Sequence, residues 1–538
     1  MLNARRVFVI AEDAFPAAGT FPRIADGRFR LASGGTSRTL RRTWLDTFDW
    51  RLFRAGLTLE HIRGQGRAEL VLTGRDGELL AAESAGGRSP TDQVRGPAEE
   101  DGPGLASLRW PCLTDSLPAG PLREQLAKVA GVRALLPVVR ATSALTERRA
   151  LNSDDKTIAV LTLDQMRLTQ PRHASPPARL SVSPLRGYEP ETARLAGLIE
   201  SIPGVSAASQ TAFEAALDAA GRQPGDYSGK IDVLLPADMP AAHAVATVLA
   251  RLAEIIQANL AGTIRDIDTE FLHDLRIAVR RTRSVLKLAG SVLPGSVTRE
   301  YRPEFKWLGD LTTPTRDLDV YLLGYAKMAA GLTAATEPDL RPFHEYLRLR
   351  RASAHRQLAR GLRSARYGRL MAQWQHDLAE VAGPARRRPA VRAFAAGRID
   401  RAHERVLRLG SSIGPASPAA DLHELRKRCK ELRYLLEVFA AIYDPAQHWR
   451  AVKELKALQD CLGEFQDTEV QQHELRSFAA QMVADQAAPA QTLLAMGEVA
   501  AGLAVRQQSA RAEFAGRFAS FASQRGRSRI ASLTGTGA

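Results

Sequence analysis

Residues 273–283 read HDLRIAVRRTR, and residues 423–433 read HELRKRCKELR, so that His, Leu and Arg recur at a constant offset of 150 residues (273 to 423). The matched residues of the two stretches and their surroundings are Leu272, His273, Leu275, Arg276, Arg283 and Leu286 with Leu422, His423, Leu425, Arg426, Arg433 and Leu436. The same offset continues without a gap and matches Lys306, Leu308, Asp310, Asp317 and Val320 with Lys456, Leu458, Asp460, Asp467 and Val470. One offset held over this length predicts two homologous helical units. We expect the two units to pack about a pseudo-twofold axis.

The length and charge of the chain limit the number of domains and the class of partner that we expect. A chain of 538 residues favours two or three domains. The excess of 74 Lys and Arg over 59 Asp and Glu gives a net charge of +15, which favours a polyanionic partner such as nucleic acid, an acidic membrane surface or a phosphate polymer. A general basic bias with no specific partner explains the charge as well. No apolar run approaches the roughly 18 residues of a membrane span, so we expect a cytoplasmic protein with no membrane partner.

The chain changes character along its length. Residues 1–217 contain short apolar or alternating runs such as RVFVI, AELVLTG and KTIAVLTL, separated by Gly, Asp and Pro, which predict an antiparallel β domain. Residues 218–240 carry Gly and Pro and are expected to form a linker. Residues 241–523 follow the helix period, and residues 524–538 are expected to be a disordered tail. The fold class is therefore α+β, with an N-terminal barrel-like domain and a C-terminal all-α domain.

The repeated helices carry their positive charges in an unusual place. At 100° per residue, His273, Arg276, Arg280, Arg283 and Lys287 share one narrow arc that borders the apolar face. His423, Arg426, Lys430 and Arg433 repeat this arc in the second unit. In one interpretation, these side chains cover apolar surface and pair with acids such as Asp310, Asp317 and Asp319. In the other, stripes from both units converge on a groove whose positive field attracts an anion.

Further basic residues have related spacings. Arg398, Arg401, Arg405 and Arg408 lie along one predicted helix, Arg348, Arg351 and His355 along another, and Lys306 and Lys456 form a matched pair. Each group alone is typical of a solvated helix face, but together they favour a basic cleft. His273 and His423 lie in the first turns of their helices, after Asp268 and after the Ser417-Pro418 pair, which are good capping residues. There they can pack, bind phosphate or ligate metal; the lack of a convergent ligand set argues against metal.

The C-terminal half resembles the CHAD domain, the conserved-histidine α-helical domain. The segments that carry the resemblance are HDLRIAVRRTRSVLKL, KWLGDLTTPTRDLDV, AHRQLARGLRSARY, RIDRAHERVLRLG, HELRKRCKELRYLLEVF and KELKALQDCLGEFQDTEV. The resemblance implies two pseudo-symmetric four-helix bundles and binding of inorganic polyphosphate in a basic central cleft, with an association with polyphosphate granules. It implies that His273, Arg276, Arg280, Arg283, His423, Arg426, Lys430 and Arg433 contribute to that cleft.

The N-terminal half resembles a CYTH domain, the triphosphate tunnel fold, on the segment TWLDTFDWRLFRAGLTLEHIRG. Catalytic members open with Glu-x-Glu-x-Lys, whose carboxylates help to bind metal ions, and here the first strand reads RRVFVIAED. The expected acidic cluster of the last barrel strands is also missing from KTIAVLTLDQM and ARLSVSPL. Without these carboxylates, metal-assisted phosphoryl attack loses its Lewis acid. We therefore interpret this half as a degenerate barrel that is not an enzyme, in which Arg41, Arg42, Arg63 and Lys156 can still bind an anion.

The sequence thus predicts non-catalytic polyphosphate binding, with no metal and no cofactor. The predicted binding residues are His273, Arg276, Arg280, Arg283, Lys287, Lys306, Arg348, Arg351, His355, Arg398, Arg401, Arg405, His423, Arg426, Lys430, Arg433 and Lys456. Two alternatives stay open: a metal-dependent triphosphatase or polyphosphate hydrolase in the N-terminal half, and a nucleic-acid binder. Nucleic acid ranks below polyphosphate because aromatic residues make up only 6% of the chain and none interleave with the basic stripes.

Overall fold

The computed structural model describes residues 5–11, 21, 27–85, 105–381 and 389–535. The chain divides into two compact units, Met1–Ser228 and Gly229–Ala538. The boundary between them falls inside the linker expected at 218–240. Each unit is described by itself.

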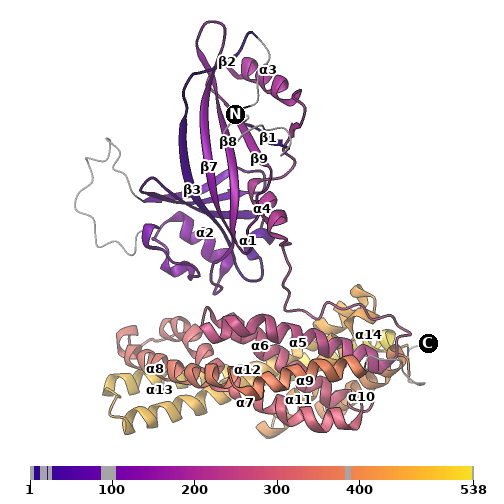
Figure 1. Cartoon of the computed structure of the whole chain (residues 1–538). Coiled ribbons are helices and arrows are strands. Elements are labelled where there is room, and N and C mark those ends of the chain that lie inside the picture. Colours follow the sequence, from indigo (N-terminus) through magenta and orange to yellow (C-terminus); the bar gives the residue numbers. More distant parts are fainter. Residues whose placement is uncertain (1–4, 12–20, 22–26, 86–104, 382–388, 536–538) are drawn as a thin grey trace. The chain divides into compact units, whose positions relative to one another are not determined.

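The N-terminal unit is built on one antiparallel sheet (Figure 1). Its strands follow the order β10-β1-β9-β8-β7-β3-β4-β5-β6, with β2 paired to β7. The strands are β1 (Arg6–Ile10), β2 (Arg30–Leu31), β3 (Thr36–Asp46), β4 (Leu57–Gly64), β5 (Arg67–Gly74), β6 (Leu79–Ala85), β7 (Leu136–Leu151), β8 (Thr157–Gln170), β9 (Ala178–Pro184) and β10 (Val205–Ala207). The predicted antiparallel β domain is therefore confirmed. Among the described strands β10 and β6 remain edges, so hydrogen bonds do not close the sheet into a full barrel.

Four helices accompany this sheet, namely α1 (Arg51–Arg54), α2 (Pro121–Ala130), α3 (Glu189–Glu200) and α4 (Ala212–Ala220). Three apolar clusters hold them to the strands, including Leu195 and Ile199 of α3, Leu122 and Leu126 of α2, and Phe213 of α4. The sheet curves around a cavity of about 690 Å³ that side chains from β1, β3, β4, β5, β7, β8 and β9 line. Side chains alternate along a strand, and Arg38, Leu40, Arg42 and Trp44 of β3 accordingly all face this cavity.

The C-terminal unit is all helical, and its helices repeat. The first half holds α5 (Ala241–Arg265), α6 (Thr269–Leu288), α7 (Gly295–Ala330), α8 (Glu337–Leu362) and α9 (Ala365–Val381). The second half holds α10 (Val391–Ser411), α11 (Ala419–Val438), α12 (Pro445–Ala484), α13 (Ala490–Ala522) and α14 (Gln524–Thr534). The helices α5, α6 and α7 begin at residues 241, 269 and 295, and α10, α11 and α12 begin 150 residues later at 391, 419 and 445. The internal repeat read from the sequence is thus a repeat of whole helices.

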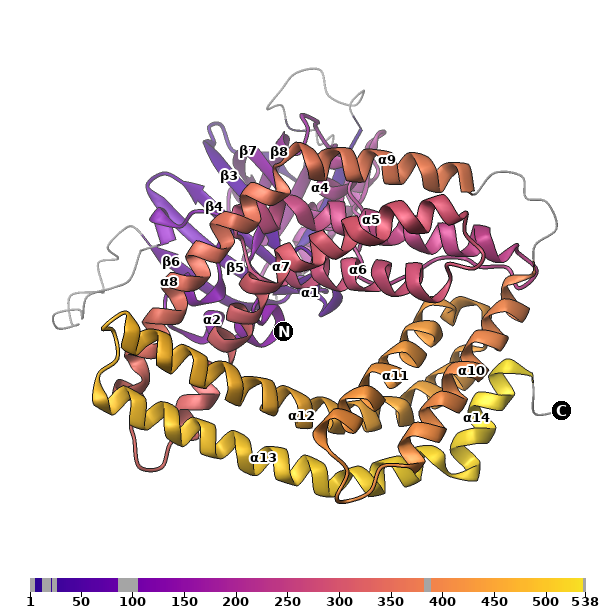
Figure 2. The ribbon, with the colours of Figure 1, turned by 90° about the horizontal axis from the view of Figure 1, so that it is seen from below.

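Packing within each half explains this arrangement. In both halves the second helix packs on the third and the fourth lies along the third, α8 along α7 and α13 along α12 (Figure 2). The fourth helix of each predicted bundle is interrupted, because α9 follows α8 and turns back onto α5, and α14 follows α13 and packs on α10. Each half therefore has five helices in the described residues, where the resemblance implied four.

The two halves share one hydrophobic core. It joins Leu249 of α5, Leu275 of α6, Leu425 of α11 and Leu455 of α12, all fully buried. A second, smaller core fills the space between the far ends of α7, α8, α12 and α13. Helix α5 has the length and hydropathy of a membrane-spanning helix, a property that buried core helices share, and more than half of its apolar window is buried here.

Two local expectations were wrong. Residues 524–534, expected in a disordered tail, form α14, because Ile530 and Leu533 are buried in the shared core; residues 536–538 lie outside the described part. Ser417 does not cap α11: its hydroxyl accepts a hydrogen bond from the Gly414 backbone, and Pro418 occupies the N-cap position. The cap predicted for α6 is confirmed, since Asp268 accepts from the backbone nitrogens of Glu270 and Phe271.

Candidate anion-binding site

The basic stripe on α6 lies against α7. Arg276 donates to the Thr313 hydroxyl at 2.5 Å and to the Gly309 carbonyl at 3.4 Å, and lies 3.8 Å from Asp317. Burial lowers the pKa of Arg276, and the neighbouring charges of Arg280, Arg316 and Arg283 lower it further against the opposing effect of Asp317. Arg276 is therefore anchored to the protein, but it stands in a field of surplus positive charge.

The next two stripe residues are not neutralised. Arg280 and Arg283 are exposed, and neither forms an ion pair with any residue that the structure describes. Arg283 passes over Gly309, where an added Cβ would lie 2.8 Å from its guanidinium nitrogen. Glycine at this position thus lets the Arg283 side chain lie flat against α7.

The stripe on α11 is more heavily paired. Nδ1 of His423 lies 2.6 Å from Gln466, Arg426 pairs with Asp467 at 2.7 Å, and Arg433 pairs with Glu437 at 2.8 Å. Lys430 differs from them, because within the described part of the chain its amine has no ion-pair partner. Burial lowers the pKa of Lys430 to about 8, with added repulsion from Arg426, Arg280 and Arg433 and a weaker opposing attraction to Asp467.

The two stripes meet at the boundary between the halves. The guanidinium of Arg280 lies 5.9 Å from the ring centroid of Tyr434 on α11, and α6 packs against α11. Arg280 and Lys430 are equivalent positions of the repeat. The positive charge of Arg280 helps to lower the pKa of Lys430. Equivalent residues come together where a pseudo-twofold axis passes, so Arg280 and Lys430 mark that axis.

A cavity of about 270 Å³ adjoins this meeting point. Its lining residues are Ser284, Lys287, Leu288, Glu424, Lys427, Arg428, Lys430, Glu431 and Tyr434. Lys287, predicted to bind anions, pairs here with Glu431 at 2.5 Å and so links α6 to α11. Arg428 pairs with both glutamates, and Lys427 pairs with Glu424.

The predicted residues on α8 divide into two kinds. Arg351 pairs with Asp266 and, at 2.8 Å, with Asp319, which is almost fully buried. Burial disfavours the charged form of Arg351, but hydrogen bonds and charge from Asp266 and Asp319 outweigh it and raise its pKa. Nε2 of His355 lies 2.8 Å from the Thr263 carbonyl oxygen. Arg351 therefore anchors α8 to the C-terminal end of α5 and to α7, and His355 contacts α5; Arg348 is exposed and without an ion pair among the described residues.

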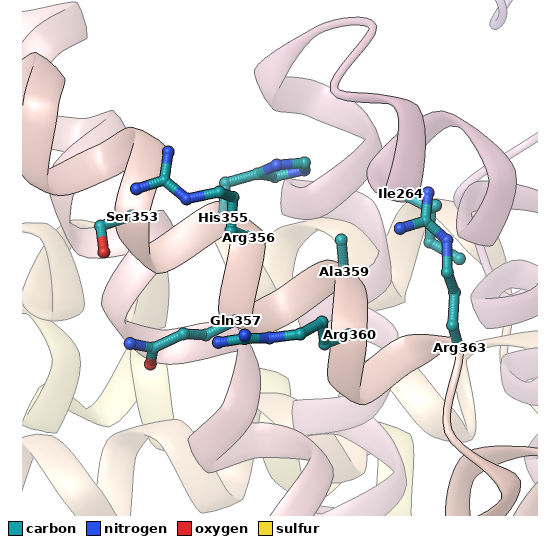
Figure 3. Close-up of a pocket in the computed structure, with 8 residues that line it drawn as sticks. All are labelled: Ile264, Ser353, His355, Arg356, Gln357, Ala359, Arg360 and Arg363. Carbon is teal, nitrogen blue, oxygen red and sulfur yellow. The ribbon is translucent and has the colours of Figure 1, made fainter.

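The same helix carries a basic cluster that the sequence analysis missed. Arg356, Arg360 and Arg363 line a pocket of about 380 Å³ together with the predicted residue His355 and with Ile264, Ser353, Gln357 and Ala359 (Figure 3). Their spacing of four and three residues puts them on one helix face. That spacing was visible in the sequence, but Arg is common along this segment and nothing distinguished these three.

The remaining predicted residues lie on α7, α10 and α12. Arg398 donates to the Ser291 hydroxyl at 2.6 Å, and burial lowers its pKa, with help from the charges of Arg401 and Arg405. Arg401 and Arg405 are exposed and make no ion pair within the described chain. Lys306 pairs with Asp310 at 2.6 Å on its own helix, whereas its repeat mate Lys456 is exposed and has no described ion-pair partner.

Both interpretations of the stripes thus find support. The predicted acids Asp310, Asp317 and Asp319 do pair with Lys306, Arg276 and Arg351. Eight of the predicted arginines and lysines have no acidic partner in the described residues, namely Arg280, Arg283, Arg348, Arg398, Arg401, Arg405, Lys430 and Lys456. His273 is partly buried on α6, near Arg276 in the sequence, and it interacts with another residue.

Potential metal ligands gather elsewhere. In the described part of the chain, His376, Asp377 and Glu380 of α9 have ligand atoms within 4.8 Å of one another. His376 and Glu380 are exposed, and Asp377 already accepts a hydrogen bond from the Tyr301 hydroxyl at 2.6 Å. The group includes neither His273 nor His423.

The cavity of the N-terminal unit holds its own charged network. Arg42 pairs with Glu60 and, at 2.9 Å, with Asp164, and its guanidinium stacks over Trp44 at 4.6 Å. Arg38 pairs with Glu147 at 2.9 Å, and Arg5 donates to the Ser181 hydroxyl at 2.9 Å. Of Arg41, Arg42, Arg63 and Lys156, named from the sequence as anion ligands, only Arg42 lines this cavity; Arg5, Arg38 and Arg179, which do line it, were not predicted.

Comparison with known proteins decides the family of the helical unit. Residues 247–476 match the family model described as the CHAD domain. The helical unit is a CHAD domain. The antiparallel sheet of the N-terminal unit is consistent with a CYTH-like fold.

Solved structures that resemble the chain include the following two. The crystal structure of the CHAD domain from the plant Ricinus communis is 27% identical, with a TM-score of 0.46, and the match covers 55% of this chain and 96% of that one. A structure described as PptA from Streptomyces chartreusis is 20% identical, with a TM-score of 0.38, and the match covers 52% of this chain and 99% of that one. No curated protein matches the chain.

Proposed function

We propose that the CHAD domain binds inorganic polyphosphate along the line where the stripes of α6 and α11 meet. The observation that carries the proposal is the pair Arg280 and Lys430, two equivalent cations that lie at the boundary between the halves without carboxylate partners in the described residues. Bringing like charges together costs free energy, and an anion bound between them offsets that cost.

The residues flanking this pair suit a linear polymer of phosphates. Arg283 extends the positive surface along α6, and Arg276 and Arg426 add guanidinium groups that are held in place by Thr313 and Asp467. Guanidinium groups donate paired hydrogen bonds to phosphate oxygens. Tyr434 contacts Arg280, but no stack of aromatic rings follows the stripes, which favours a polymer without bases.

The direct test is a titration of the full chain with long-chain polyphosphate and with single-stranded DNA of similar charge. We expect polyphosphate to bind more tightly and to displace DNA. The three unpaired cations of this line, Arg280, Arg283 and Lys430, with about 0.7 counterions released per contact by analogy with single strands, predict a slope of roughly −2 or steeper in log affinity against log salt concentration. DNA displacing polyphosphate, or a slope near zero, would contradict the proposal.

Two corollaries belong to the proposal. A cytoplasmic protein that binds polyphosphate would associate with polyphosphate granules, which imaging of a tagged full chain would reveal. The N-terminal unit would act as a structural or anion-binding partner and not as a hydrolase.

A further inference from the structure

The cavity between α6 and α11 contains one cation that differs from the rest. Lys287, Lys427 and Arg428 each form an ion pair with Glu424 or Glu431. Lys430 lines the same cavity, is half-buried, and has no ion-pair partner in the part of the chain that the structure describes. Burial lowers the pKa of its amine.

The charged groups around Lys430 all affect the pKa of its amine. Arg280 approaches from α6, Arg426 and Arg433 from its own helix, and Asp467 from α12, so that three cations oppose one carboxylate. Asp467 is already engaged with Arg426 at 2.7 Å. The pKa of about 8 that results leaves a substantial share of the amine neutral near pH 7.5.

We propose that Lys430 is a site of covalent acylation by small acyl phosphates. Arg280, which has no carboxylate partner in the described residues, attracts the phosphate group of such a compound, and the cavity of about 270 Å³ beside the amine admits a small acyl group. A lysine that is desolvated and next to other cations is an activated nucleophile. Attraction of the reagent and activation of the amine thus act at the same place.

The reaction balances without a further reagent. The lone pair of the neutral amine attacks the acyl carbon and forms a C–N bond, while the bond from that carbon to the phosphate oxygen breaks. The phosphate leaves with the bonding electrons, and the proton of the amine passes to solvent. The product is an uncharged amide in place of a cation at the axis, so acylation lowers the affinity for polyphosphate; this consequence alone rests on the proposed function.

The test uses the full chain and acetyl phosphate, with the modified lysines quantified by peptide mass spectrometry. We expect Lys430 to be labelled roughly tenfold faster than Lys453 or Lys456, which are exposed and do not line this cavity. Its rate should level off above pH 8, because the amine is then largely neutral. Labelling of Lys430 no faster than that of Lys453, or a rate that keeps rising above pH 8, would overturn the proposal.

Two further arms separate the causes. In Arg280→Gln, acetyl phosphate should label Lys430 several-fold more slowly. The rate of labelling by a neutral N-hydroxysuccinimide ester should fall less, because only the anionic reagent is attracted by the arginine. An equal loss with both reagents would contradict attraction by Arg280. Added polyphosphate should protect Lys430; if labelling continues unchanged, acylation stands and polyphosphate binding at this position is wrong.

Discussion

Arg281 on α6 donates a hydrogen bond to Glu437 on α11 at 3.1 Å. The repeat offset carries Arg281 to Glu431 and Glu437 to Lys287, and these two residues form the second ion pair across the same boundary, at 2.5 Å. The two ion pairs are therefore related by the pseudo-twofold symmetry. At each of the two equivalent positions, a basic residue on α6 corresponds to an acidic residue on α11. This exchange shows that the pseudo-twofold axis passes between α6 and α11, next to Arg280 and Lys430.

The first prediction concerns this boundary. Arg281→Ala removes a charged hydrogen bond between partly buried side chains, so we expect a loss of about 1.5–3 kcal/mol in the free energy of unfolding. Urea denaturation of the full chain measures it. Arg517→Ala, which breaks an exposed pair within α13, is the control and should leave the midpoint almost unchanged. Equal effects of both substitutions would show that the boundary pair has no special role.

The second prediction separates structural from binding arginines on α8. Arg351→Ala leaves Asp319 buried and unpaired, which should cost about 3–5 kcal/mol of stability. Arg348→Ala should leave stability nearly unchanged, because the exposed Arg348 has no described ion-pair partner, and should weaken polyphosphate binding. Thermal melting and binding titrations on the same preparations distinguish them. Stable Arg351→Ala protein with lost binding would restore Arg351 to the binding site.

The third prediction concerns pH. Bound phosphates favour the charged form of Lys430 and raise its pKa above the value of about 8 in the free protein. Between these two values the complex holds more protons than the free protein, so affinity for polyphosphate should fall as pH rises from 8 to 9.5. Lys430→Arg keeps its charge in this range and should remove most of the fall. Identical pH profiles for both proteins would exclude Lys430 as the titrating group.

The fourth prediction concerns catalysis. In the N-terminal cavity Glu60, Asp164 and Glu147 pair with Arg42 and Arg38, which leaves these carboxylates without free charge for a divalent metal. We expect no hydrolysis of tripolyphosphate or ATP with Mg²⁺ or Mn²⁺, measured as phosphate release. Turnover above background that disappears in Asp164→Asn would show that the cavity is an active site after all.

The repeat was the most informative feature of the sequence. Helix period and a constant offset identify helices and their duplication because both are local or regular patterns, and α10, α11 and α12 begin 150 residues after α5, α6 and α7. The helices α9 and α14 were not predicted, because each of them turns back onto a partner far away in sequence.

The candidate site was only partly predictable for the same reason. Helix geometry places Arg276, Arg280 and Arg283 on one face, but it does not say which of them meets an acid. Arg351 was assigned to the site from its spacing to Arg348, yet its partner Asp266 lies 85 residues away. Among residues of one type and one spacing, only the three-dimensional partners separate anchored cations from free ones.

Polyphosphate binding at the axis depends most directly on Arg280 and Lys430. The decisive measurement is the polyphosphate affinity of the full chain carrying Arg280→Ala with Lys430→Ala, set against Arg299→Ala with Lys327→Ala, two exposed cations of α7 whose loss changes the net charge equally. We expect the first pair to lose about 3 kcal/mol or more, at least roughly 100-fold in affinity, with an unchanged melting temperature, and the second to lose far less. Equal losses from both pairs, or an earlier melt of the first pair with its affinity intact, would contradict polyphosphate binding at the axis.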